Sequence, residues 1–349
     1  MAYISFQPSD FFSSKIYVGT GSTATVTGVG FQPDMAWIKI IESAYNATMW
    51  DSVRGANNRL FTPTNAANVV DEPDGYVSAF TADGYTVTAG SSSDDYVNNT
   101  SDDYMSWNWK AGTTTGLSGG TITPTSYSIN TTSGVGIYKF TGTGSAGTIA
   151  HGLGATPTMI IVKKTNTTGD WYVYHKDMPS GNGYHLRLNA TSYEASGTEW
   201  NSTDPTSTVF SLGANSNVNA SAATFIAYVF APVKGYSQFG SYTGLNNSNG
   251  PFVYTGFRPA FLMVKTANSD AQRWNIMDSK RAGFNPNGWR LFADSSSAQL
   301  TNINGADLLS NGFKMRINDA CVNGTPTYIY MAFAEFPIVS SNDVPGVAR

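Results

Sequence analysis

Short apolar runs, each bounded by proline and turn residues, dominate the hydrophobic pattern of this chain. The clearest three are residues 35–39, 159–163 and 261–265, and each ends in a lysine. Runs of this length between turn signals are typical of strands in a sandwich core. Residues 328–333 carry apolar side chains on both alternating faces, which predicts a central strand. No amphipathic helix of three turns is visible, so the pattern predicts an all-β fold.

The three runs belong to an internal repeat. Each unit has a Thr-Gly turn, a proline, the apolar run that ends in lysine and, later, a closing aromatic strand. The lysine follows the proline by six residues in all three units, and the last aromatic residue follows the lysine by 70, 67 and 68 residues. This agreement predicts three tandem antiparallel β-sandwich domains, jelly-roll-like, with about eight strands each. The landmarks, in chain order, are Pro33, Lys39 and Trp109; Pro157, Lys163 and Phe230; Pro259, Lys265 and Phe333.

These landmarks also set approximate domain limits. Units of about 100 residues can each close their own core, so we expect three domains in a row that form a rigid rod. The limits are a docking arm (1–14), a first unit (15–110), a linker (111–118), a second unit (119–235), a third unit (236–337) and a C-terminal tail (338–349).

Composition and charge exclude several classes of function. Only 13% of the 349 residues are charged, and 20 Lys and Arg against 24 Asp and Glu give a net charge of −4, which argues against nucleic-acid binding. No apolar run approaches the roughly 18 residues of a membrane span, and no signal peptide is recognisable at the N-terminus. Cys321 is the single cysteine, so no intrachain disulfide can form.

The three histidines do not form a recognisable metal or catalytic motif. His175 and His185 are ten residues apart and one strand would place them on the same face, but no third zinc ligand lies nearby. His175 also occupies the repeat position of Asp51 and Asp278. We therefore expect structural roles for these residues.

Three further motifs have a structural and a chemical interpretation. Residues 142–147 match G-x-G-x-x-G, but no helix start follows, so a hairpin turn is favoured over dinucleotide binding. Asp94-Asp95 and Asp102-Asp103 could offer oxygens to Ca²⁺, although a solvated loop is favoured. Glu194 and Glu199 are conceivable glycoside-cleaving carboxylates without further support. We predict no catalytic residue, no cofactor and no metal site, and leave bound Ca²⁺ open.

Tryptophan and tyrosine raise the question of sugar binding. Trp50, Trp171 and Trp274 lie at similar places after the lysine run, and Trp107 and Trp109 share one face of the closing strand, so core packing is favoured for all five. Aromatic residues at irregular positions are better candidates for a rim that stacks on sugar rings. The candidates for this glycan-binding rim are Trp200, Tyr193, Trp289 and Tyr236.

An aspartate and an arginine recur together after the lysine run. They are Asp51 with Arg54 in the first unit and Asp278 with Arg281 in the third, with a serine after each aspartate. We expect each pair to form a structural, hydrogen-bonded ion pair that ties a loop to its sheet.

Several segments resemble a family of virion-associated proteins of tailed bacteriophages that infect marine and other aquatic bacteria. They are the opening Phe6-Gln-Pro-Ser-Asp10, the segments Trp-Asp-Ser-Val-Arg-Gly and Tyr-Met-Ser-Trp-Asn-Trp-Lys-Ala, and Phe-Gly-Ser-Tyr-Thr-Gly. The resemblance covers nearly the whole chain and implies a phage structural protein. It transfers no catalytic residue.

These observations favour a non-enzymatic virion protein, assembled in the bacterial cytoplasm. The first hypothesis is a receptor-binding tail fibre, a homotrimer that contacts host cell-surface polysaccharide. The alternative is a capsid decoration protein, and the third is a glycan depolymerase. We expect the arm to dock onto another virion protein or onto the first unit through Tyr3, Phe6, Phe11 and Phe12, and expect its deletion to leave the three domains folded.

Overall fold

The computed structural model describes residues 6–70, 72–93, 96–269, 272–301 and 304–336. Almost all of its regular structure is antiparallel β-sheet, as the hydrophobic pattern predicts. Its longest α-helix among these residues, α1 (Ser216–Asn219), has four residues. No helix in this part of the chain is long and apolar enough to cross a membrane.

The strands of the first unit are β1 (Phe12–Val18), β2 (Ala24–Val26), β3 (Met35–Ile40), β4 (Thr48–Asp51), β5 (Leu60–Phe61), β6 (Tyr76–Thr81), β7 (Gly84–Thr88) and β8 (Asp103–Trp109), with short 3-10 helices at η1 (Pro8–Asp10) and η2 (Glu72–Asp74). Those of the second are β9 (Ser126–Asn130), β10 (Val135–Thr141), β11 (Gly147–Ala150), β12 (Met159–Lys164), β13 (Trp171–His175), β14 (Tyr184–Arg187), β15 (Ala195–Ser196), β16 (Val209–Leu212) and β17 (Thr224–Phe230). Those of the third are β18 (Ser237–Thr243), β19 (Phe252–Tyr254), β20 (Phe261–Thr266), β21 (Asn275–Asp278), β22 (Leu291–Phe292), β23 (Ala306–Leu309), β24 (Gly312–Met315) and β25 (Thr327–Phe333).

The three units have one strand order in their large sheets. The first has β1-β8-β3-β4-β5, the third has β18-β25-β20-β21-β22, and the second has β10-β17-β12-β13-β14 with β9 and β15 added at its ends. A small sheet accompanies each large one: β2-β7-β6, β11-β16 and β19-β24-β23. The lysine run and the closing strand, recognised in the sequence, are neighbours at the middle of every large sheet.

Both faces of each large sheet are buried, and this explains why its strands are apolar throughout. Along β3, Ala36 and Ile38 pack in a cluster with the small sheet of the same unit. The alternate residues Met35 and Trp37 belong to a second cluster that extends across all three units. A strand has period two, so a sequence that must cover both faces loses its polar positions.

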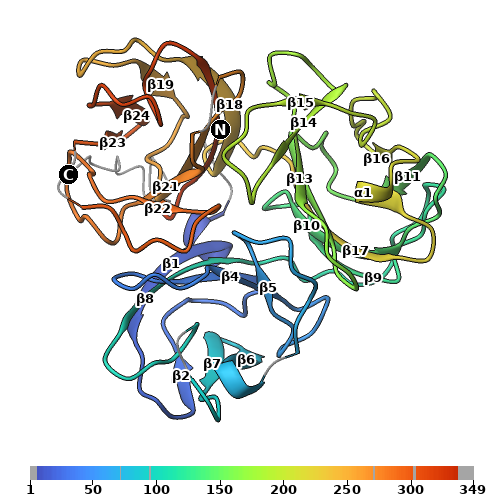
Figure 1. Cartoon of the computed structure of the whole chain (residues 1–349), viewed down its shortest axis with the longest axis horizontal. Coiled ribbons are helices and arrows are strands. Elements are labelled where there is room, and N and C mark those ends of the chain that lie inside the picture. The colour runs from blue at the N-terminus through green and yellow to red at the C-terminus, as the bar shows by residue number, and fades with distance from the viewer. Residues whose placement is uncertain (1–5, 71, 94–95, 270–271, 302–303, 337–349) are drawn as a thin grey trace.

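The second cluster lies where the three large sheets meet, and Figure 1 shows the units as three lobes around this centre. The ring of Phe333 lies 5.5 Å from Phe12 of the first unit and 6.1 Å from Phe230 of the second. Trp109 lies 5.5 Å from Phe261. The expected rod of three domains in a row is therefore wrong: the units surround a shared aromatic core.

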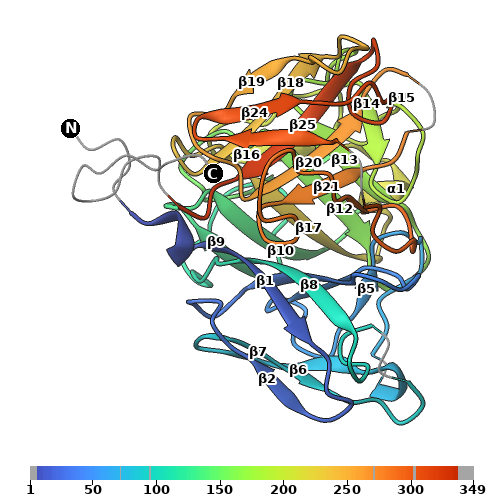
Figure 2. The ribbon, with the colours of Figure 1, turned by 90° about the vertical axis from the view of Figure 1, so that its left-hand side faces the viewer.

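Backbone hydrogen bonds close the ring of units. In each case a loop amide of one unit donates to the backbone carbonyl of the residue two positions after the repeated lysine of another unit. These bonds link the first unit to the second, the second to the third and the third to the first. The three bonds, each of 2.8 Å, are Asn68 to Thr165, Glu194 to Ala267 and Gln299 to Ile41. Figure 2 shows the small sheet of the first unit at the opposite end of the molecule from β19 and β24.

The predicted docking arm is shorter than 14 residues and contacts its own chain. Strand β1 starts at Phe12, whose side chain is fully buried in the shared core. Phe6 and Phe11 pack on each other at 5.0 Å and on Tyr236 at 5.5 and 6.4 Å. Tyr3 lies outside the described residues. Deleting residues 1–14 would remove the first three residues of β1, including the buried Phe12, so the structure predicts that the deletion destabilises the first unit.

Candidate functional site

A buried asparagine braces the Thr-Gly turn in every unit. In the second unit, Asn219 Nδ2 donates to the Ser145 carbonyl at 2.7 Å, and its Oδ1 accepts from the Thr143 amide at 2.8 Å. A Cβ on Gly142 would lie 2.2 Å from the Ala220 carbonyl oxygen, so only glycine fits there. The G-x-G-x-x-G match thus belongs to a braced turn, and no helix starts there to bind a phosphate. The equivalent asparagines are Asn98 and Asn323.

Sequence reasoning missed these asparagines, although the repeat contains their signal. They precede the last aromatic residue of the closing strand by 11, 11 and 10 residues. Asparagine is so common in the loops of this chain that its recurrence at one repeat position does not stand out in the sequence. Buried polar groups require partners, and each of these three side chains has donors and acceptors around it.

One buried basic residue in each unit lies beside a carboxylate. It directly precedes a leucine in a short strand, which is Leu60, Leu186 or Leu291. In the second unit this position is taken by His185, so the histidine replaces an arginine of the other units. The pairs are Arg59 with Asp74, His185 with Glu199, and Arg290 with Asp319.

The His185–Glu199 pair is the closest approach to a catalytic dyad in the described residues. Nδ1 and Oε2 are 3.0 Å apart, at angles outside the hydrogen-bonding range. Burial raises the pKa of Glu199, but His185 and the Asn217 amide on its other oxygen outweigh this effect, so the pKa is lowered. A Cβ on Gly197 would lie 1.9 Å from Oε2, so backbone covers this oxygen. The side chains of His185 and Glu199 are 10% and 3% exposed, so the pair lies beneath the surface.

Glu194 and Glu199 do not form a pair of glycoside-cleaving carboxylates. Glu194 is buried, and its two oxygens accept from the Ser180 hydroxyl at 2.7 Å and the Ser180 amide at 3.2 Å. Its own amide supplies one of the bonds that link the second and third units. Each glutamate thus has its own structural partners.

The structure brings together both predicted Asp–Arg pairs. Arg54 Nε lies 2.6 Å from Asp51 Oδ2, and Arg281 Nε lies 2.6 Å from Asp278 Oδ2, with all four side chains buried. In both pairs the arginine amide also donates to the aspartate. The Tyr228 hydroxyl, from the second unit, donates to Asp51 at 2.6 Å. The pairs therefore contact neighbouring units as well as their own loops.

His175 takes the aspartate position in the second unit. Its Nε2 lies 3.3 Å from the Tyr330 carbonyl of the third unit, and Nδ1 accepts from the Asp177 amide at 3.1 Å. Burial lowers the pKa of His175 to about 4. Among the described residues no group of three His, Cys, Asp or Glu could hold a metal ion. His175 and His185 therefore occupy separate framework positions.

The three repeated lysines are buried, and each amine donates to at least two backbone carbonyl oxygens. Lys163 Nζ donates to Lys164 at 2.8 Å, Gly169 at 2.9 Å and Asn65 of the first unit at 3.4 Å. Burial lowers the pKa of Lys39 and Lys163 to about 7 and that of Lys265 to about 8. A lysine with a low pKa is a potential nucleophile. These amines are instead enclosed between units, where no substrate reaches them.

The predicted glycan rim is wrong for two of its four members. Trp200 and Tyr236 are 2% and 0% exposed, because Trp200 packs on Tyr174 and Tyr236 packs on Phe333 in the shared core. Trp289 is half-buried and Tyr193 is exposed. Irregular spacing does not imply exposure in this fold, because its loops are themselves buried between units.

Trp50 is not equivalent to Trp171 and Trp274. The strand registers align Asp51, His175 and Asp278. Trp50 lies one residue before this aligned position, whereas Trp171 and Trp274 lie four residues before it. Trp171 Nε1 donates to the Phe61 carbonyl at 3.0 Å, and Trp274 Nε1 donates to the second unit's Arg187 carbonyl at 2.9 Å. Trp50 bonds within its own unit.

The proposed Ca²⁺ ligands do not gather into a site. Asp94 and Asp95 lie outside the described residues. The Asp102 carboxylate accepts from the Asn99 amide side chain, and Asp103 belongs to β8. Nothing in the described part of this loop resembles a cage of oxygens.

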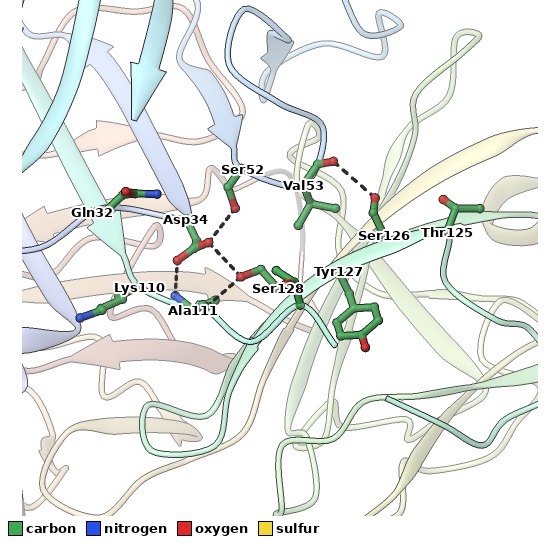
Figure 3. Close-up of a pocket in the computed structure, with 12 residues that line it drawn as sticks. Gln32, Asp34, Ser52, Val53, Lys110, Ala111, Thr125, Ser126, Tyr127 and Ser128 are labelled. Atoms are coloured by element: carbon green, nitrogen blue, oxygen red, sulfur yellow. Dashed lines mark hydrogen bonds between the residues drawn. The ribbon is translucent and has the colours of Figure 1, made fainter. Parts of the chain in front are cut away.

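A cleft of about 530 Å³ lies between the first unit and β9, and Asp34 forms its floor (Figure 3). Asp34 accepts hydrogen bonds from the Ser52 hydroxyl at 2.7 Å, the Ser128 hydroxyl at 2.8 Å and the Ala111 amide at 2.8 Å. Oδ1 accepts both hydroxyl bonds and Oδ2 accepts the amide bond, so the carboxylate helps to join the first unit to the linker and to β9. A carboxylate has about four lone-pair positions, so one position on Oδ2 is left open.

The linker contributes to this junction. Thr113 and Ile129 of β9 exchange two backbone hydrogen bonds of 2.9 Å, so residues 111–118 are attached to the second unit.

Comparison with known proteins identifies a family for this chain but no activity. A family model described as a domain of unknown function (DUF7483) matches residues 7–337. The match covers most of the chain, which therefore belongs to this family. No curated protein and no solved structure matches the chain.

Proposed function

We propose that this DUF7483 protein is a non-enzymatic component of a bacteriophage virion surface that recognises host cell-surface glycan from the tail. The observation that carries the proposal is an uneven distribution of exposed apolar side chains. Six of the ten large exposed ones in the described residues belong to the third unit, although the three units share one framework. They are Leu245, Phe252, Tyr254, Phe284, Leu300 and Phe336.

The polar residues support a binding role over a catalytic one. The repeated asparagines, lysines and ion pairs are buried and bonded within or between units. Chemistry would require a titratable group that faces a cleft, and the carboxylate of Asp34, in the cleft beside β9, already accepts three hydrogen bonds from the protein itself. What remains available is surface, and exposed apolar side chains that lie together on one face mark a candidate binding site.

A capsid decoration protein is the second candidate, and the closed three-lobed body favours it. The fibre hypothesis expected an elongated rod, whereas three units around one centre make a compact body (Figure 1). Such a body fits a threefold position of a head lattice without forming a homotrimer. The expected homotrimer stays a prediction, which sedimentation analysis of the purified chain would test.

Labelling intact particles with an antibody against this chain separates the two candidates. We expect electron microscopy to place the label on the tail or its tip. Label distributed over the head would overturn host recognition in favour of decoration. Absence of label from purified particles, together with a positive signal in the infected cell, would overturn both.

A further inference from the structure

Two exposed aromatic rings lie side by side on the outer face of the third unit's small sheet. Phe252 and Tyr254 of β19 are 46% and 60% exposed, while Val253 between them points into the core and is 8% exposed. Residues two apart on a strand are about 7 Å from each other on the same face. The two aromatic side chains therefore share one exposed face of β19, and this pair is defined here as the β19 platform.

The first unit shows that the fold does not need these rings. Val253 pairs with Phe313, as Val26 pairs with Tyr85 and Ile149 pairs with Phe210, so β19, β2 and β11 are equivalent. The core residue is apolar in all three units. At the positions that correspond to the platform, the first unit has Thr25 and Thr27, which are both exposed. The second unit has Thr148 and Ala150, and Ala150 is buried.

The neighbouring strand adds a positive charge to the platform. Lys314 of β24 is directly opposite Phe252, so both side chains lie on the same face. Asp307 of β23 lies directly opposite Lys314 on its other side, and the Asp307 carboxylate pairs with Arg316 Nε at 3.5 Å. Lys314 itself forms no ion pair or side-chain hydrogen bond among the described residues. Gly312 lies opposite Tyr254, and a Cβ there would be 3.0 Å from Phe252 Cε2, so the ring of Phe252 reaches across the glycine.

We propose that the β19 platform binds an acidic glycan, with a pyranose ring stacked on Phe252 and Tyr254 and its carboxylate paired with Lys314. The apolar C–H face of a pyranose stacks on an aromatic face while its hydroxyls stay in water. A carboxylate is the group that an unpartnered ammonium beside such rings recognises. Two rings are also too small an area for a stable protein partner, which needs about 800 Å² on each side. This inference rests on the proposed host-recognition function and gives it a location.

The test uses the purified full-length chain on an array of uronate- and sialate-containing oligosaccharides with their neutral counterparts. The variants Phe252→Thr and Tyr254→Thr restore the residue type of the first unit, and Lys314→Gln removes the charge. The matched control is Phe284→Ser, because Phe284 is 75% exposed in the same unit but lies outside the platform. Unchanged thermal unfolding would establish that each variant folds.

We expect at least one acidic glycan to bind the natural chain, and each platform variant to bind it roughly tenfold more weakly. The control should bind normally, and reduction of the glycan's carboxyl to an alcohol should weaken binding as much as Lys314→Gln does. Acidic-glycan binding that survives the two threonine variants would overturn the site while host recognition stands. Absence of acidic-glycan binding would overturn this inference, and label over the head would separately overturn the proposed function.

Discussion

Replacing Phe333 by alanine should destabilise all three units together. The ring is fully buried at the shared core, and its neighbours include Phe12 and Trp109 of the first unit and Phe230 of the second. Truncation of a buried phenylalanine costs about 3–5 kcal/mol, as transfer free energy plus the cavity left behind. We expect the upper part of that range, because sheets from three units surround the site and cannot all collapse into it.

The assay is urea unfolding at pH 7 followed by tryptophan fluorescence, with hydrogen exchange resolved by peptide. The matched control is Phe313→Ala, because Phe313 is equally buried in the third unit but belongs to that unit's own cluster. In Phe333→Ala, amides in β1 and β10 should lose protection together with those in β25. In Phe313→Ala, the loss should be concentrated in β19, β23 and β24. If Phe333→Ala changed exchange only within the third unit, the claim that the shared core couples the units would be refuted.

Three further predictions concern single framework residues. Burial lowers the pKa of His175 from 6.5 to about 4, so the stability that neutral His175 contributes is complete above pH 6.5 and is lost as the pH falls toward 4. Urea unfolding at pH 7 and pH 4.5 should therefore show that His175→Gln loses less stability between these pH values than the natural chain does, by up to roughly 3 kcal/mol. Burial lowers the pKa of Lys163 from 10.5 to about 7, so between pH 7 and 9.5 this lysine loses its proton in the folded state but keeps it in the unfolded state, and stability should rise with pH. Lys163→Met should show a shallower rise of stability with pH, and a slope identical to that of the natural chain would contradict the burial argument. Asn219→Ala should cost about 2–4 kcal/mol because it leaves two turn groups without partners, and calorimetry would reject the brace if the melting temperature did not fall.

Local pattern was sufficient to predict the strands at the middle of each large sheet. Proline, an apolar run and lysine recur at fixed spacing because this strand is buried on both faces and ends at a unit boundary. The pairing of Asp51 with Arg54 was also predictable, since both residues lie in one tight turn. Short-range geometry fixes these features, so one segment of sequence contains all the information needed.

The arrangement around a centre was not predictable in the same way. A strand that is apolar on both faces requires two covers, but its sequence does not say whether the second cover is a sheet of its own unit or a neighbouring unit. For the same reason Trp200 and Tyr236 gave no sign of burial, because the contacts that bury them come from distant segments. A linear row of three units and an arrangement around a centre have the same local sequence patterns and differ only in long-range packing.

Comparison of the three units separates framework from function more sharply than any single residue does. Where His185 replaces arginine, a carboxylate still lies beside it, although the three carboxylates come from different loop positions. Where Phe252 and Tyr254 replace the exposed Thr25 and Thr27 of the first unit, apolar surface is exposed to water. A folding requirement explains the first kind of difference and cannot explain the second, because the first unit folds with small residues at the same positions. Selection for contact with a partner accounts for the exposed rings, and this reasoning directs the search for a ligand to the third unit.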